Sequence, residues 1–347
     1  MGGPPAGIPL TILVTGGGGF LGGAIVEQLL EREVLVRSFA RSANPDLLAR
    51  GVEVLQGDIA DPDAVSSAVE GAEAVIHVAA KAGFWGSVEE YYRPNVIGTA
   101  NVIAACRAYG VDRLVYTSTP SVVHAGGDVA GIDESAPYPD SYTSPYPATK
   151  AEAERLVLAA NGDDLGTVAI RPHLIWGPGD NQLVPRLIER ARQGRLRLVG
   201  DGANLIDTTF IDNAAHAHVL ALDRLAPGSA IAGRAFFIAQ GEPKPMKETL
   251  NLLLAAAGAP TVDKHISAPT ATRLGAVAER VWRVGRLTGE PPLTRFLAEQ
   301  LATAHWYDLS NAARDLDYTP VVTFDEGLAR LAAFYRGSGG ERLSDRI

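Results

Sequence analysis

The sequence predicts an α/β fold: a doubly wound parallel sheet with helices on both faces, followed by a smaller, mostly helical lobe. Short β-rich runs alternate with helical patterns, and a glycine-rich turn joins the first run to the first helix. Strands that alternate with helices form parallel sheets buried on both faces. Beyond Gly177 the alternation loosens into helices separated by Pro and Gly, which predicts the second lobe; these helices are expected at residues 182–193, 246–257, 270–287 and 293–302. Strand runs are expected at residues 11–14, 34–39, 52–55, 74–78, 113–117, 167–171 and 235–239.

The glycine-rich turn at residues 15–22 follows the first strand run and leads into a helical pattern at residues 24–30. Backbone N–H groups at the start of a helix that follows such a turn can hold a pyrophosphate. The turn therefore predicts a dinucleotide site, and the alternative is a glycine turn that binds nothing. The expected contacts are Gly16, Gly19, Phe20 and Leu21.

Tyr146 and Lys150 are the candidate acid/base pair. Residues four apart share one face of a helix, so the lysine can hold its charge beside the phenol and favour the phenolate. An unperturbed tyrosine titrates near ~10, and a nearby cation makes its proton available to a carbonyl or alcohol oxygen. The alternative is a surface tyrosine and lysine that meet by chance.

The two motifs, in this order, resemble those of the extended short-chain dehydrogenase/reductases, which carry T-G-x-x-G-F-[IL]-G and Y-x-x-x-K. The resemblance extends over nearly the whole chain. It implies a Rossmann-type fold and a nicotinamide cofactor, with Tyr146 and Lys150 both catalytic and in contact with the cofactor. The other cofactor contacts that it implies are Asp58, Ile59, Ala79, Ala80, Lys81 and Pro172.

A hydroxyl-bearing stretch follows the fifth strand run, where this family carries the hydroxyl partner of its tyrosine. Aligned on the end of the strand, Thr119 falls on the family's serine position and Ser118 falls on the neighbouring one. Both residues offer an O–H donor, so both are candidates.

The end of the second strand run bears on the choice of cofactor. NAD-selective folds place Asp or Glu there to hold the ribose 2′-hydroxyl. This run ends without an acid, and Arg41 together with Arg37 is expected to meet a 2′-phosphate; the alternative is that both arginines are merely solvated. We therefore expect NADPH, with NADH as a second candidate. The missing acid also disfavours a nucleotide-sugar epimerase with tightly held NAD.

The C-terminal half resembles one branch of that superfamily, the 3β-hydroxysteroid and sterol-4-carboxylate 3-dehydrogenases. Within that branch, residues 79–87 and 118–122 look closest to bacterial reductases of 2-alkyl-3-oxoalkanoic acids, which serve long-chain olefin hydrocarbon biosynthesis. The resemblance implies NADPH-dependent reduction of such a lipid-like 3-oxo acid to its 3-hydroxy acid. Oxidation of a 3β-hydroxysteroid or sterol-4-carboxylate is the alternative, because 4-carboxysterols are also β-hydroxy acids. A redox sensor that binds nucleotide without turnover is disfavoured, because such relatives typically lack the tyrosine or the lysine.

Composition excludes several other classes of protein. A net charge of −9 gives no basic surface for nucleic acid. Cys106 is the only cysteine, so no disulfide forms within the chain, and we expect a core thiol. His216 and His218 face different directions on a helix, and no metal site is expected. The N-terminal residues 1–6 show no targeting pattern, which predicts a cytoplasmic enzyme.

We expect residues 8–180 to form the nucleotide-binding domain with the catalytic residues. Residues 181–347 form the expected substrate lobe, which is discontinuous because segments near 208–224 and 233–240 return to the first domain. A helical pattern at residues 270–287 carries an apolar stripe with arginines along one flank. Three interpretations of the stripe are open: core packing, an acyl-chain wall, or adhesion to a membrane or a pathway enzyme. A homodimer is a further expectation.

Overall fold

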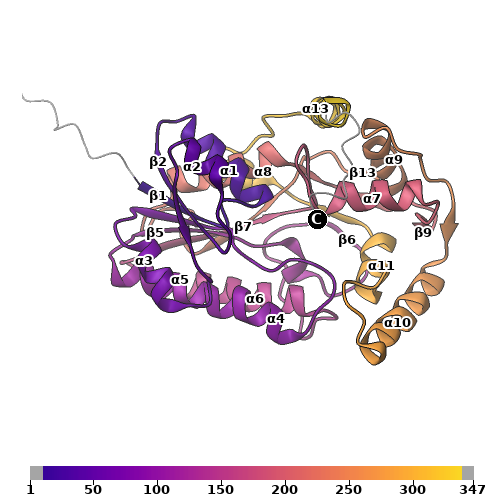
Figure 1. Ribbon diagram of the computed structural model, residues 1–347, viewed down its shortest axis with the longest axis horizontal. Coiled ribbons are helices and arrows are strands. Elements are labelled where there is room, and N and C mark those ends of the chain that lie inside the picture. Colours follow the sequence, from indigo (N-terminus) through magenta and orange to yellow (C-terminus); the bar gives the residue numbers. More distant parts are fainter. Residues whose placement is uncertain (1–10, 338–347) are drawn as a thin grey trace, which may run out of the picture.

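The structure is a computed structural model that describes residues 11–337. Within that range, a seven-stranded parallel sheet has the order β12-β7-β5-β4-β1-β2-β3, on the left of Figure 1. All the expected strand runs lie in this sheet, with bounds that differ by at most one residue. The expected fold class is confirmed. The strands are β1 (Thr11–Thr15), β2 (Leu35–Ala40), β3 (Glu53–Gln56), β4 (Ala74–His77), β5 (Arg113–Thr117), β7 (Gly166–Pro172) and β12 (Arg234–Ile238).

Helices cover both faces of the sheet because successive strand side chains point to opposite sides. On β1, Ile12 packs in the cluster that includes Ile25 of α1, whereas its neighbour Leu13 packs in the cluster that includes Val102 of α5. Figure 1 shows α1 and α8 above the sheet, with α3, α5 and α6 below it. These helices are α1 (Phe20–Leu30), α3 (Pro62–Val69), α5 (Gly98–Ala108), α6 (Pro145–Ala159) and α8 (Ile211–Arg224).

The sheet reverses its strand order at β1, which pairs with β2 on one side and with β4 on the other. In open α/β sheets, ligands bind at the carboxyl ends of the strands beside such a reversal. The glycine turn after β1, Arg41 after β2 and the 78–81 stretch after β4 all lie at this edge. The topology therefore brings the expected cofactor contacts to one end of the sheet.

The rest of the chain surrounds a four-stranded sheet of order β13-β10-β15-β6. The lobe helices were expected at residues 182–193, 246–257, 270–287 and 293–302, and the structure has each of them with bounds shifted by up to two residues. Figure 1 places them on the right of the molecule. The lobe helices are α7 (Leu183–Arg192), α9 (Met246–Ala256), α10 (Ala268–Gly285) and α11 (Arg295–Ala302), and the strands are β6 (Val129–Ile132), β10 (Leu205–Ile206), β13 (Lys244–Pro245) and β15 (His305–Tyr307).

The two parts of the molecule are not separate in sequence. Strand β6 comes from the first half of the sequence but pairs with β15, so the two halves interleave. The expected division into two domains at residue 180 stays a prediction. Residues 8–10 of the first expected domain and 338–347 of the second lie outside the described residues. So do residues 1–6, for which no targeting pattern was expected. The remaining elements are α2 (Pro45–Ala49), α4 (Val88–Tyr92), a π-helix (Arg93–Ile97), a 3₁₀ helix (Pro120–Val123), β8 (Ile175–Trp176), β9 (Leu198–Val199), β11 (Thr209–Phe210), β14 (His265–Ile266), α12 (Ser310–Leu316) and α13 (Phe324–Gly337).

Two further features of the described residues complete this architecture. Cys106 is buried in α5, where burial raises the pKa of its thiol to about 12, as expected for a core thiol rather than a nucleophile. None of the helices in the described part of the chain combines the length and apolar composition that a bilayer-spanning segment needs.

Candidate active site

The glycine turn leaves open space at the start of α1. Gly16 has a φ of 72°, and a Cβ there would lie 3.0 Å from the Ala79 nitrogen, so glycine is required. A Cβ on Gly19 would meet only the Gly16 oxygen, at 3.2 Å, which leaves space on its outer side. Gly19 caps α1 without a side-chain acceptor, and the first turn carries no acidic residue. The N–H groups that follow, including those of Phe20 and Leu21, fit the pyrophosphate expected there.

Of the two arginines expected near the adenosine ribose, only Arg41 lies at the carboxyl ends of the strands, where the glycine turn is. Arg41 follows β2 directly and is exposed, and no ion pair or hydrogen bond engages it among residues 11–337. Arg37 donates instead to the Glu53 carboxylate, at 2.7 Å, and to the carbonyl oxygens of Ala68 and Glu70. Those carbonyls lie at the C-terminal end of α3, which is near the amino ends of the strands and therefore opposite to the expected cofactor site. The expectation that Arg37 meets a 2′-phosphate is therefore wrong.

The remaining expected cofactor contacts lie at the same end of the central sheet. Asp58 is exposed after β3, and Ile59 packs under Gly98 of α5, where a Cβ would lie 2.7 Å from the isoleucine side chain. Ala79 donates its N–H to the Thr15 hydroxyl at the end of β1. The residues of this set are Asp58, Ile59, Ala79, Ala80, Lys81 and, at the end of β7, Pro172.

Asn95 fixes the 78–81 stretch against α6. Its side-chain oxygen accepts from the Lys81 N–H at 2.7 Å, and its amide nitrogen donates to the Thr149 hydroxyl on α6 at 3.0 Å. It is fully buried in the π-helix, whose wider turn carries Pro94. In the sequence, the stretch from Asn95 to Thr99 resembles a helix segment of the superfamily. Its periodicity does not show that the Asn95 side chain joins residues 78–81 to α6.

The Tyr146 phenol lies beside Thr119. Burial raises the pKa of Tyr146, and a hydrogen bond with the Thr119 side chain opposes that rise. The Ser118 hydroxyl is buried without a hydrogen-bond partner among the described residues, and its backbone N–H is bonded to the Ile170 oxygen at 2.6 Å. Of the two hydroxyl candidates, Thr119 is thus the one in contact with the tyrosine.

Lys150 lies on the same helix face but points deeper into the site. Its ammonium donates to the Thr117 carbonyl at 2.6 Å and stands 4.2 Å from the centre of the Tyr116 ring. Burial lowers the pKa of Lys150 to about 7, and the carboxylate of Glu154 opposes that fall. The rise in the Tyr146 pKa has no contribution from Lys150, so the expected charge effect on the phenol is not seen in this structure.

A buried ion pair under Lys150 was missed by the sequence reasoning. Glu154 accepts from the Arg171 guanidinium at 2.6 and 2.9 Å and from the Tyr138 hydroxyl at 2.5 Å. Its side chain is fully buried, and Arg171 lies on β7 just before Pro172. The signal was available, because Glu154 continues the four-residue spacing of Tyr146 and Lys150 along α6. The Glu154 carboxylate thus lies near the Lys150 ammonium, and its ion pair with Arg171 joins α6 to the sheet.

Aromatic side chains connect the surroundings of Tyr146 with the lobe. The Tyr91 ring centre lies 6.4 Å from that of Tyr146. The loop after β4 then reaches the lobe, where Phe84 packs 6.0 Å from Phe296 of α11 and Trp85 lies under the Arg283 guanidinium of α10. Aromatic contacts therefore extend from the candidate catalytic tyrosine to α10 and α11, and we call the pair of Phe84 and Phe296 the apolar wall.

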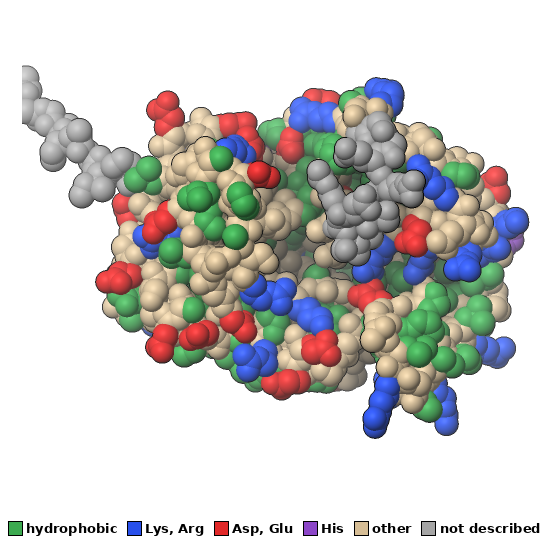
Figure 2. Space-filling view, viewed as in Figure 1, with side chains coloured by type: hydrophobic (Ala, Val, Ile, Leu, Met, Phe, Trp, Pro, Cys, Tyr) green, Lys and Arg blue, Asp and Glu red, His purple; other side chains and the backbone are tan. Residues whose placement is uncertain are grey.

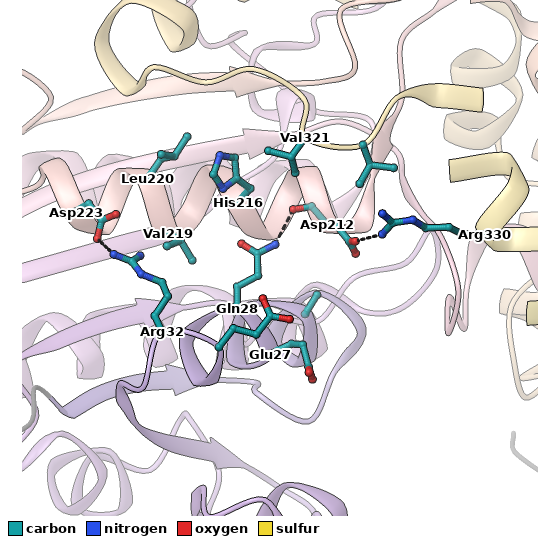
Figure 3. A pocket seen from close by; sticks show the side chains of 13 residues that line it. Glu27, Gln28, Arg32, Asp212, His216, Val219, Leu220, Asp223, Val321 and Arg330 are labelled. Carbon is teal, nitrogen blue, oxygen red and sulfur yellow. Dashed lines mark hydrogen bonds and ion pairs between the residues drawn. The ribbon is translucent and has the colours of Figure 1, made fainter. Parts of the chain in front are cut away.

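A surface pocket between α1 and α8 lies away from this site (Figure 3). Two of its lining arginines are paired: Arg32 bonds to Asp223 at 2.9 Å, and Arg330 bonds to Asp212 at 2.7 Å. His216 lines the pocket, whereas His218 is buried, with its ring 2.8 Å from the Thr117 hydroxyl. The two histidines thus face different directions, as expected.

The geometry can be set beside known proteins. The profile of the 3-beta hydroxysteroid dehydrogenase/isomerase family matches residues 13–267. The chain belongs to this family. A 2-alkyl-3-oxoalkanoate reductase of Stenotrophomonas maltophilia (strain K279a) is 62% identical over 326 residues, which span 93% of this chain and 99% of that protein. A decarboxylating sterol-4-alpha-carboxylate 3-dehydrogenase of Mus musculus is 37% identical, over 91% of this chain and 88% of that protein.

Solved structures agree with the fold. MoeE5, solved in complex with UDP-glucose and NAD, superposes with a TM-score of 0.72 and 26% identity, over 94% of this chain and 99% of that one. The expected superfamily resemblance is confirmed. The protein is an oxidoreductase that acts on a CH–OH or C=O group.

Proposed function

We propose that the protein reduces a 2-alkyl-3-oxoalkanoic acid to the 2-alkyl-3-hydroxyalkanoic acid with NADPH, as a step toward long-chain olefin hydrocarbons. The observation that carries this proposal is the 62% identity with a 2-alkyl-3-oxoalkanoate reductase along almost the full length of both chains. The half-buried Tyr146 and the buried Thr119 and Lys150 supply the acid/base group, the carbonyl ligand and the cation that such a reduction needs.

The reaction assigns one role to each of these side chains. A bound nicotinamide supplies the hydride that adds to the ketone carbon. Tyr146 donates its phenolic proton to the ketone oxygen, and Thr119 hydrogen-bonds that oxygen and holds it beside the phenol. Lys150, now on the Thr117 carbonyl, is within one helical turn of Tyr146 and stabilises the phenolate as the proton leaves. Its ammonium also anchors the ribose.

The preference for NADPH rests on the end of β2. The strand closes without an acidic residue, and the exposed Arg41 lies next to the glycine turn. Its guanidinium can pair with a 2′-phosphate through charge-assisted hydrogen bonds. NADH lacks that phosphate and loses this contact.

The substrate assignment also fits the chemistry of the acid. A β-keto acid loses CO2 readily, whereas the hydroxy acid survives to a following step, so reduction protects the carboxyl group. The apolar wall of Phe84 and Phe296 is suited to alkyl chains, and we assign the region from residue 181 onward to the substrate lobe. The sterol-4-carboxylate reaction is a second candidate, because the 37% identical mouse relative acts on a related β-hydroxy acid.

The reverse reaction gives the cleanest test, because 3-oxo acids decarboxylate in solution. The protein is supplied with NADP⁺ and stable 2-alkyl-3-hydroxy acids of increasing alkyl length, and reduced cofactor is followed by absorbance. Each methylene that enters the wall should raise kcat/KM by up to about fourfold, until the wall is filled. Turnover with 3β-hydroxysteroids alone would replace the proposal with the sterol alternative.

A further inference from the structure

Helix α10 presents an apolar face to solvent. Its inner face packs on α11, and a Cβ on Gly275 would lie 2.7 Å from the backbone carbon of Thr294. The opposite face carries what we term the apolar stripe. These side chains are Leu274, Val277, Val281 and Val284, with exposed fractions of 53%, 61%, 49% and 77%. Because the stripe is exposed, core packing does not explain it.

Arginines flank the stripe along the same helix. Four of them, within or just after α10, are exposed. The only acidic residue of the helix, Glu279, is buried and bonded to Arg295. Figure 2 shows the result at the lower right, where hydrophobic and basic side chains lie together on α10. The flanking residues are Arg273, Arg280, Arg283 and Arg286.

The charge of this helix is opposite to that of the protein. The chain carries a net charge of −9, yet α10 gathers uncompensated positive charge beside its apolar stripe. Whatever covers this face must therefore be both apolar and anionic. In a symmetric pair of chains each copy would bring the same arginines to the contact, which disfavours a second copy. An anionic lipid surface offers acyl chains to the stripe and phosphates to the arginines.

We propose that α10 docks the protein onto an anionic lipid surface, with the apolar stripe among the acyl chains and the arginines against the headgroups. The docked face is continuous with the candidate active site, because Arg283 of α10 lies over Trp85 and Phe296 of α11 packs on Phe84. A lipid-like substrate then reaches the apolar wall from the surface on which it is dissolved. This last point rests on the proposed function, whereas the docking does not.

The test is flotation of the full-length protein with vesicles, without substrate or cofactor. Vesicles of phosphatidylglycerol and phosphatidylethanolamine are compared with vesicles of phosphatidylcholine. The protein should bind the anionic vesicles and bind the neutral ones at least tenfold more weakly, because each arginine contributes roughly fivefold at an anionic surface. Failure to bind anionic vesicles, or equal binding to both kinds, overturns the proposal.

Two double variants separate the apolar and the charged contributions. Val277→Ser with Val281→Ser should weaken binding roughly ten- to thirtyfold by removing immersed side chains, and Ser matches Val in helix propensity. Its control is Leu35→Ser with Val321→Ser, at positions that are 48% and 54% exposed elsewhere on the surface. An equal loss in this control overturns the role of α10.

The charged variant is Arg273→Gln with Arg280→Gln, which should weaken binding to anionic vesicles roughly twentyfold. Its control removes the same charge away from α10, with Arg50→Gln and Arg107→Gln, and should keep most of the binding. Light scattering of the lipid-free protein tests the competing possibility that a second copy of the chain covers the stripe. A dimer that the Val277→Ser, Val281→Ser variant dissociates would show that the stripe joins two copies and would overturn the proposal.

Discussion

Two neighbouring glycines at the start of α1 allow the cofactor loop to be tested with a matched pair of variants. A Cβ on Gly22 would lie 2.1 Å from the Gly16 oxygen and 2.9 Å from the Gly17 Cα, both of them backbone atoms of the loop. A Cβ on Gly23 would have its nearest such neighbour, the Gly17 oxygen, at 3.6 Å, an ordinary contact. Both residues lie inside α1, so alanine improves helix propensity equally at each position.

The magnitudes follow from these distances. Gly23→Ala should stabilise the protein by up to about 1 kcal/mol, the helix-propensity difference between Gly and Ala. Gly22→Ala gains the same amount but must displace the loop, and overpacking of this kind costs roughly 1–3 kcal/mol. The two variants should therefore differ by roughly 1–3 kcal/mol in the free energy of unfolding. Only Gly22→Ala should weaken NADPH binding, because it moves the Gly16 to Gly19 backbone.

Urea unfolding and fluorescence titration with NADPH measure the two quantities on the same samples. The wild-type protein provides the reference for both variants. Equal stability of Gly22→Ala and Gly23→Ala, with unchanged NADPH affinity in each, would refute the packing described for this turn.

Three further predictions concern the candidate site. Arg41→Asp should weaken NADPH far more than NADH in binding titrations, because it replaces a phosphate contact with repulsion; a wild type that prefers NADH, with no change in the variant, would contradict it. Thr119→Val should lower kcat at least tenfold, whereas Ser118→Ala should change it little, and the reverse order would move the hydroxyl role to Ser118. Lys150 loses its proton as pH rises through its pKa of about 7, so NADPH affinity should fall by up to about tenfold per pH unit above that value. A flat affinity profile between pH 6 and 9, values bracketing that pKa by about one to two units, would remove the ammonium from cofactor binding.

The sequence predicted those features in which local pattern determines structure. Each strand of the central sheet is a short apolar run, and a parallel sheet covered on both faces requires such runs. The glycine turn needed no further information, because Gly16 is required by its own backbone angle and by the approach of Ala79. The four-residue spacing likewise placed Tyr146 and Lys150 on one face of α6.

The sequence could not predict what side chains do across the fold. Arg37 and Arg41 lie on or just after the same strand, but only the fold shows that the Arg37 guanidinium reaches the end of α3. Spacing put Lys150 near Tyr146 without revealing that its ammonium prefers the Thr117 carbonyl. The stripe on α10 has the periodicity of a core helix, and its exposure follows from α11 packing on the opposite side.

Tyr146→Phe tests the central claim, that this protein reduces a carbonyl with the Tyr146 phenol as the proton donor. The variant keeps the ring that packs against Tyr91 and deletes only the hydroxyl. Turnover of a 2-alkyl-3-hydroxy acid with NADP⁺ should fall by roughly 10²–10⁴, the contribution of general acid/base catalysis, while cofactor affinity in the same preparation stays within about twofold of wild type. Near-normal turnover in Tyr146→Phe would contradict the account.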